Sequence, residues 1–120
     1  MIDDPTTAEA IRAIIRRADR EEAVGLLYRA AGEPEIVLAL DNISSTPESS
    51  YVISTASLLS GLKLIVDDVG SLSESDVVIW HSHPTGAKGP SRKDMRTKLP
   101  GLRYAVVTMD ESGELDFVEY

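Results

Sequence analysis

The sequence predicts an α/β sandwich, in which helices pack on a central β-sheet. Two segments carry apolar residues at helical spacing, and several short apolar runs typical of strands lie between and after them. Strands and helices arranged in this way bury their apolar faces as a sheet covered by helices. The 120 residues are enough for one compact domain with one core, so we predict a single domain over residues 1–120.

The first helix and the hairpin after it are predicted from spacing and turn residues. Apolar side chains recur at helical spacing over about residues 7–20, and Thr6 or Thr7 can cap the start of this helix. Residues 23–28 and 36–40 are apolar runs on either side of a turn that contains Gly and Pro. These two runs are therefore expected to pair as a β-hairpin.

The later elements follow from the same signals. Apolar residues lie at helical spacing over residues 55–66, although Gly61 weakens that prediction. The run from Val77 to Trp80 is typical of a buried strand, in which Trp80 is expected to fill core. The remaining predicted segments are loops over residues 42–50 and 85–90, a polar connection over 67–76, a short helix over 91–98, and strands over 104–109 and 115–120.

Composition and charge exclude several classes of function. The net charge of -8 argues against a nucleic-acid binder, because a phosphate backbone is held by clustered Lys and Arg. The chain has no cysteine, and so no disulfide framework and no thiolate metal site. No apolar run approaches the roughly 18 residues of a membrane span, and the first residues lack the pattern of a signal peptide. A cytoplasmic location is therefore expected.

The only two histidines of the chain, His81 and His83, lie one residue apart directly after the apolar run that ends at Trp80. Because side chains alternate along a strand, both imidazoles are expected to point the same way. Asp94 lies near the start of the next predicted helix, where the preceding loop can fold it back toward the strand end. Two histidines and one carboxylate leave a fourth position for water, which is the pattern of a catalytic zinc site. We therefore predict one zinc ion per chain, held by these three residues.

Hydrolysis at such a site also needs a general base and a donor for the oxyanion. Glu22 is the candidate base, because it opens the first predicted strand, and Ser91 is the candidate donor. The pair Ser91 and Asp94 is also a helix-capping pattern, so both residues could be purely structural. The two roles are compatible, since Asp94 could bind metal while Ser91 begins its helix.

These residues closely resemble the signature of the JAMM (MPN+, prokaryotic JAB-type) metalloproteases. That signature is His-x-His-Pro, six residues, then Ser-x-x-Asp, with a Glu placed upstream, three residues before a Gly. Here it reads His81-Ser82-His83-Pro84, six residues, then Ser91-Arg92-Lys93-Asp94, with Glu22-Ala23-Val24-Gly25 upstream. Many relatives have Cys where this chain has Val24, a position expected to be packing.

The resemblance implies a fold, a site and an activity. The fold would be the JAMM three-layer sandwich, similar to cytidine deaminases, with a mixed central sheet flanked by helices. His81, His83 and Asp94 would bind zinc, Glu22 would activate a water, and Ser91 would stabilise the tetrahedral intermediate. The family cleaves peptide or isopeptide bonds, often beside the C-terminus of ubiquitin or a ubiquitin-like sulfur-carrier protein.

Other functions remain open on the sequence alone. The tail of a ubiquitin-like protein as substrate predicts a groove that holds an extended peptide by strand addition. The substrate could instead be a peptide cross-link in peptidoglycan, as proposed for phage-tail relatives. A non-catalytic interaction module with this fold is a second alternative, although this chain keeps every ligand. A zinc hydrolase acting on a small molecule is a third, but the Cys-x-x-Cys of zinc deaminases is absent. The oligomeric state is not predicted.

Overall fold

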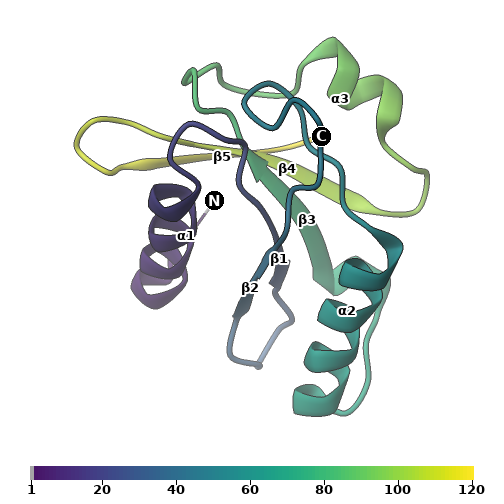
Figure 1. Ribbon diagram of the computed structural model, residues 1–120. Coiled ribbons are helices and arrows are strands. Elements are labelled where there is room, and N and C mark those ends of the chain that lie inside the picture. The colour runs from purple at the N-terminus through teal and green to yellow at the C-terminus, as the bar shows by residue number, and fades with distance from the viewer. Residues whose placement is uncertain (1) are drawn as a thin grey trace.

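A computed structural model of the chain describes residues 2–120, and Met1, which the predicted domain includes, lies outside these residues. The elements are α1 (Pro5–Ala18), β1 (Val24–Tyr28), β2 (Ile36–Leu40), α2 (Thr55–Val69), the 3-10 turn η1 (Glu74–Asp76), β3 (Val77–Ser82), α3 (Arg92–Thr97), β4 (Arg103–Met109) and β5 (Leu115–Glu119). The five strands form one sheet in the order β2-β1-β3-β4-β5 (Figure 1). Strands β3 and β4 are parallel and the other pairs are antiparallel, so the predicted mixed sheet is confirmed.

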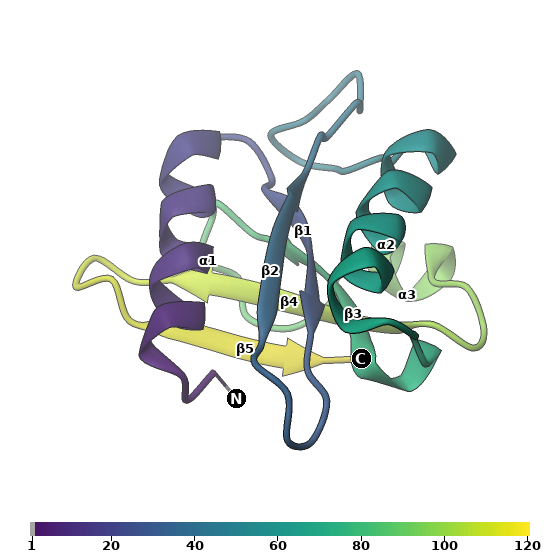
Figure 2. The same cartoon turned by 90° about the horizontal axis from the view of Figure 1, so that it is seen from below.

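Each face of the sheet is covered by one long helix. Ile11 of α1 packs in a core cluster with Leu27, Trp80 and other residues of one sheet face. Ile65 of α2 packs in a second cluster with Leu26 and other residues of the opposite face. Figure 2 shows the two helices on either side of the hairpin formed by β1 and β2. The α/β sandwich predicted from the sequence is therefore present, with the sheet as its middle layer.

The start of α1 differs from the prediction. Asp4 caps the helix: its carboxylate accepts the N–H of Thr6 at 2.8 Å and that of Thr7 at 3.4 Å. Neither threonine is therefore the cap. Pro5 explains the earlier start, since the first helical position needs no N–H and proline has the φ that a helix requires there.

Two further elements extend beyond their predicted ends. Helix α2 continues to Val69 and ends where Gly70 takes a φ of 91°. Gly61, which weakened the prediction of this helix, is buried against Leu26, and a Cβ on it would lie 2.9 Å from that side chain. Strand β3 continues through His81 and Ser82, so the first histidine lies inside the strand. Among residues 2–120, no helix is both long and apolar enough to cross a membrane.

Trp80 fills the core as predicted, and Gly25 is the residue that makes room for it. The Trp80 side chain is fully buried and lies opposite Gly25 across the β1–β3 pair. A Cβ added to Gly25 would lie 2.6 Å from the indole ring and 2.5 Å from the carbonyl oxygen of Leu38. Real Cβ atoms do not approach neighbours this closely, so any other residue would force the hairpin and the indole apart.

We predict that Gly25→Ala lowers the free energy of unfolding by about 3 kcal/mol, because overpacking a closed core displaces side chains and backbone. Urea unfolding followed by the fluorescence of Trp80, the only tryptophan, measures this change. Ala56→Gly, on the exposed side of α2, is the control and should cost about 1 kcal/mol through helix propensity alone. An unchanged midpoint for Gly25→Ala would show that the indole moves aside without loss.

Candidate metal centre

Both histidines lie at the C-terminal end of the central strand β3. His81 is fully buried in the strand, and His83 follows the strand with its N–H donating to the carbonyl of Val107 in β4 at 3.3 Å. Ser82, between them, points to the other face and accepts the N–H of Ala23 on its Oγ at 2.8 Å. The period of two expected for a strand is therefore kept across the three residues.

Asp94, in the first turn of α3, lies at the same end of the sheet. Ser91 caps the helix: its Oγ accepts the N–H of Asp94 at 3.0 Å, and Asp94 Oδ2 accepts the N–H of Ser91 at 2.9 Å. This is the capping box predicted as a structural role for the pair. The same Oδ2 atom also faces both histidines, so Asp94 combines the cap with a position in the candidate metal site.

Three donor atoms converge at the site. Nε2 of His81 and Nε2 of His83 are 3.1 Å apart, and Oδ2 of Asp94 lies 3.2 Å from the first and 3.1 Å from the second. Zinc bonds of about 2.0–2.1 Å in a tetrahedron place neighbouring ligand atoms roughly 3.3 Å apart. The donor set therefore has the spacing that a tetrahedral zinc ion requires.

The hydrogen bonding of His83 also favours a cation between these atoms. Its Nδ1 lies 2.9 Å from the carbonyl oxygen of Ala87, and because a carbonyl only accepts, Nδ1 carries the proton. In the neutral ring Nε2 then presents a lone pair toward Asp94 Oδ2. Two acceptors at this separation repel each other unless a positive charge lies between them, and the carbonyl contact is the outer support commonly found behind a metal-binding histidine.

The pKa values at the site suit metal binding. Burial lowers the pKa of His81 to about 4, against an opposing effect of the Asp94 carboxylate. For Asp94, burial acts to raise the pKa, but the hydrogen bonds from Ser91 and the charges of the histidines outweigh it, and the pKa lies below its usual value. At neutral pH His81 is therefore a neutral imidazole and Asp94 an ionised carboxylate. These are the protonation states that a metal ion needs.

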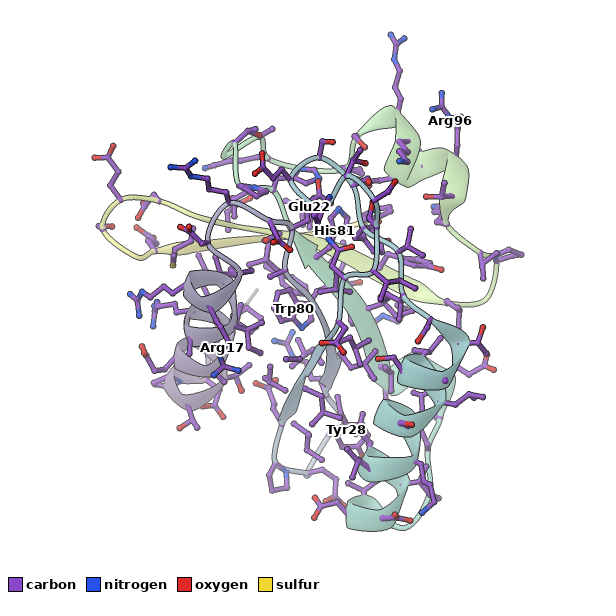
Figure 3. The ribbon with its side chains drawn as sticks, in the orientation of Figure 1. Arg17, Glu22, Tyr28, Trp80, His81 and Arg96 are labelled. Atoms are coloured by element: carbon purple, nitrogen blue, oxygen red, sulfur yellow. The ribbon has the colours of Figure 1, made fainter. Side chains whose placement is uncertain are left out.

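Glu22 lies beside this cluster, in the segment that leads into β1 (Figure 3). The backbone N–H of Glu22 donates to the carbonyl of Pro47 at 2.7 Å. The backbone carbonyl of Glu22 accepts a hydrogen bond from the side-chain amide of Asn42 at 3.0 Å. The residue is 7% exposed, whereas Glu21 is exposed, as expected for neighbours on opposite faces. Burial raises the pKa of Glu22 to about 7, while the nearby His83 acts to lower it. Glu22 is thus a carboxyl group poised to exchange a proton near neutral pH.

Two aromatic residues around His81 were missed by sequence reasoning. The ring of Tyr51 stacks on His81 with centroids 4.3 Å apart and an angle of 29° between the planes. The ring of Tyr120 meets His81 edge-on at 6.2 Å. Tyr51 follows a polar loop and Tyr120 follows β5, so no spacing connects either of them to the histidines. The two rings therefore pack around the imidazole of His81.

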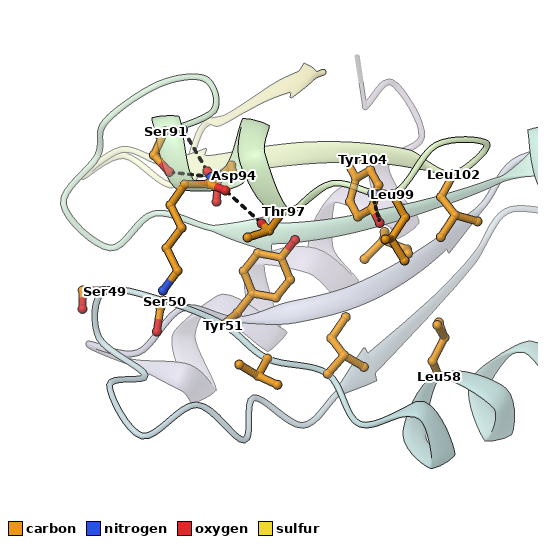
Figure 4. A pocket seen from close by; sticks show the side chains of 14 residues that line it. Ser49, Ser50, Tyr51, Leu58, Ser91, Asp94, Thr97, Leu99, Leu102 and Tyr104 are labelled. Atoms are coloured by element: carbon orange, nitrogen blue, oxygen red, sulfur yellow. Dashed lines mark hydrogen bonds between the residues drawn. The ribbon is translucent and has the colours of Figure 1, made fainter.

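A cleft beside the site was also missed. Its volume is about 360 Å³, and it is lined by Ser91 and Asp94 at one end and by largely apolar side chains beyond (Figure 4). We call it the apolar cleft. Its apolar wall comprises Tyr51, Val52, Ile53, Leu58, Leu99 and Leu102. These residues come from three separate segments, which only the tertiary fold brings together.

We predict that Asp94→Asn weakens zinc binding by about 100-fold or more, because it removes the anionic ligand while keeping an oxygen that can cap α3. Competition with a fluorescent zinc chelator measures the affinity. Asp116→Asn, on β5, is the matched control and should leave the affinity unchanged. Equal affinities for Asp94→Asn and the unaltered protein would mean that Asp94 is only a helix cap.

A second prediction concerns the stability of the metal-free protein. The pKa of Glu22 is about 7 in the fold against 4.5 for an ordinary glutamate, so folding favours the protonated form. This contribution to stability is complete below pH 4.5 and is lost as the pH rises from 4.5 through 7. Metal-free Glu22→Gln should therefore be more stable than the metal-free unaltered protein at about pH 8, by up to about 3 kcal/mol.

Urea unfolding across this pH range measures the difference. Below pH 4.5 the carboxyl group is protonated in both the folded and the unfolded chain, so the two proteins should unfold at the same urea concentration. A difference that does not change with pH would assign the effect to packing.

Comparison with known proteins agrees with this geometry. The family model described as prokaryotic homologs of the JAB domain matches residues 5–118. A curated protein of Thermus thermophilus named "Probable TtuB-protein conjugate cleaving protease" is 31% identical over 102 residues, which cover 85% of this chain and 66% of the relative. The family match spans nearly the whole chain, including Glu22 and the segment from His81 to Asp94. The chain therefore belongs to the prokaryotic JAB family.

Proposed function

We propose that this protein is a zinc-dependent metallopeptidase that hydrolyses a peptide or isopeptide bond beside the C-terminus of a ubiquitin-like or sulfur-carrier protein. The observation that carries the proposal is the convergence of His81, His83 and Asp94 within 3.2 Å, next to the buried carboxyl group of Glu22. The name of the Thermus thermophilus relative, a protease that cleaves protein conjugates, supports the same class of reaction.

The three converging residues would hold the metal, with one zinc ion per chain. Bound zinc would supply Lewis-acid chemistry, lowering the pKa of water toward about 7 and polarising a carbonyl group. The residues of the chain contribute the geometry. Burial of His81 keeps it neutral, and the capping box keeps Asp94 ionised and pointed at the two imidazoles.

Glu22 would transfer the proton that the hydrolysis of an amide requires. A water molecule loses a proton as its oxygen bonds to the carbonyl carbon, and the leaving nitrogen gains one as its bond to that carbon breaks. The buried carboxyl group of Glu22 would accept the first proton and donate it in the second step. The amide is thereby converted to a carboxylic acid and a free amine.

Ser91 would donate a hydrogen bond to the oxyanion that forms between these steps. Its Oγ already accepts the N–H of Asp94 at 3.0 Å, so the hydroxyl hydrogen is left to donate elsewhere. Ser91 is exposed and lines the apolar cleft together with Asp94. A substrate carbonyl beside the metal would therefore lie within reach of a donor that the cap itself orients.

The apolar cleft would hold the tail of the substrate in an extended conformation. Val52, in one wall of the cleft, makes both of its backbone hydrogen bonds to the start of the loop over residues 42–50. Its carbonyl accepts the N–H of Ile43 at 3.0 Å, and its N–H donates to Asn42 Oδ1 at 3.2 Å. Within residues 2–120, the N–H groups of its neighbours Tyr51 and Ile53 have no hydrogen-bond acceptor. In an extended segment these groups point the other way, where a peptide could add as a strand.

We predict that Glu22→Gln keeps one zinc per chain and lowers kcat at least about 1,000-fold, because the amide group cannot accept the proton. Ser91→Ala should lower kcat about 100-fold through loss of the oxyanion donor. Both are measured by release of product from a lysine isopeptide conjugate, with zinc counted by metal analysis. Glu48→Gln is the control for a glutamate that lies outside the site. A fully active Glu22→Gln protein would remove Glu22 from the mechanism.

A further inference from the structure

The two histidines of the candidate metal centre are oriented in different ways. Nδ1 of His83 donates to the carbonyl of Ala87 at 2.9 Å. His81 is fully buried, yet its Nδ1 has no hydrogen-bond partner among residues 2–120. A metal-binding histidine usually donates its second ring N–H to an acceptor, and this hydrogen bond fixes the orientation of the ring. No group in the described part of the chain gives His81 that hydrogen bond.

Tyr51 gives His81 a contact of another kind. Its ring stacks on the imidazole with 4.3 Å between the centroids and 29° between the planes. Tyr120 meets the same imidazole edge-on, with 6.2 Å between the centroids. A ring stacked on one face restricts rotation of the imidazole about its Cβ–Cγ bond, because a large rotation would drive the edge of the imidazole into the neighbouring ring. That rotation is the one that decides where Nε2 points.

Hydrogen bonds on both sides fix the backbone of Tyr51, although this residue belongs to no helix or strand. The side-chain amide of Asn42 donates to the carbonyl of Ser50 at 3.0 Å, and its oxygen accepts the N–H of Val52 at 3.2 Å. Ser50 is itself buried. The position of the Tyr51 ring therefore depends on a defined loop, which suits a residue that has to hold another side chain in place.

We propose that Tyr51 is a positioning residue for the metal centre: by stacking on His81 it directs Nε2 of this ligand toward the metal ion, as the carbonyl of Ala87 does for His83. The inference rests on the metal site of the proposed function. The aromatic ring carries the role and the hydroxyl group does not, because the contact is between ring faces. A ligand that is already oriented loses less freedom when it binds the metal, so loss of the stack weakens metal binding without removing a ligand.

A purely structural role for Tyr51 predicts a different result. Tyr51 also lines the apolar cleft (Figure 4), so its replacement removes packing there as well. A loss of packing alone would lower the temperature of unfolding and leave the metal affinity of the folded protein unchanged. The test therefore measures metal binding directly, with readouts that do not depend on catalysis.

Zinc affinity is measured at a fixed neutral pH by competition with a fluorescent chelator. Tyr51→Leu removes the flat ring and should weaken zinc binding about tenfold, the size of effect found when the outer support of a metal ligand is lost. Tyr51→Phe keeps the ring and should bind zinc within about twofold of the unaltered protein. Phe117→Leu is the matched control. It removes a half-buried ring from β5, in the core cluster on the α1 side of the sheet, and should leave the affinity unchanged.

Cobalt(II) gives a second readout, because it binds the same nitrogen and oxygen ligands and its visible absorption depends on their geometry. The cobalt bands of Tyr51→Leu should shift or broaden, and those of Tyr51→Phe and Phe117→Leu should match the unaltered protein. Equal zinc affinity and equal cobalt spectra for Tyr51→Leu and the unaltered protein overturn the proposal. A Tyr51→Phe protein that binds zinc as weakly as Tyr51→Leu also overturns it, because the effect would then belong to the hydroxyl group.

The same proteins separate this proposal from the proposed function. If Tyr51→Leu loses zinc affinity as expected, but the zinc-loaded unaltered protein releases no product from a lysine isopeptide conjugate, the proposed function fails and the role of Tyr51 stands. If the unaltered protein cleaves the conjugate and Tyr51→Leu binds zinc equally well with the same cobalt spectrum, the role of Tyr51 fails and the proposed function stands.

Discussion

The pairing of Ala23 with Ser82 is the contact on which the whole site depends. The N–H of Ala23 donates to Ser82 Oγ at 2.8 Å, and the N–H of Ser82 donates to the carbonyl of Ala23 at 2.9 Å. Glu22 directly precedes one partner, and His81 and His83 flank the other. A buried bond between residues 59 apart in sequence therefore fixes the carboxyl group relative to the two imidazoles, and the β1–β3 register continues from it with Val24 opposite His81.

Asp94 meets a different constraint, because α3 has only six residues. A helix of this length is not stable by itself, so its cap has to define where it begins. Ser91 and Asp94 supply that cap, and the hydrogen bond that closes it also stabilises the carboxylate as an anion. The local requirement for a defined helix start and the requirement of a metal ion for an ionised ligand are thus met by the same oxygen atom.

The sequence predicted the elements well because most of them depend on local periodicity. Residues 36–40 were predicted and observed with the same bounds, and the His81–His83 spacing placed two candidate ligands from the strand period alone. The cap at Asp4 was missed because Thr6 and Thr7 carry the same local signal. Tyr51 and the apolar cleft could not be predicted, since their partners on α3 and β4 are set only by the tertiary fold.

Residues 42–50 were predicted only as a loop, yet Asn42 in this loop forms part of the site. Its side-chain amide donates to the carbonyls of Glu22 and Ser50 at 3.0 Å, and its oxygen accepts the N–H of Val52 at 3.2 Å. The side chain of Asn42 therefore connects Glu22 with the segment that carries Tyr51. Asn42 and Ile43 also line a second cavity, of about 480 Å³, and residues 49 to 53 line the apolar cleft. The position of Glu22 beside the histidines and the position of Tyr51 at the apolar cleft thus depend on hydrogen bonds of one side chain, Asn42.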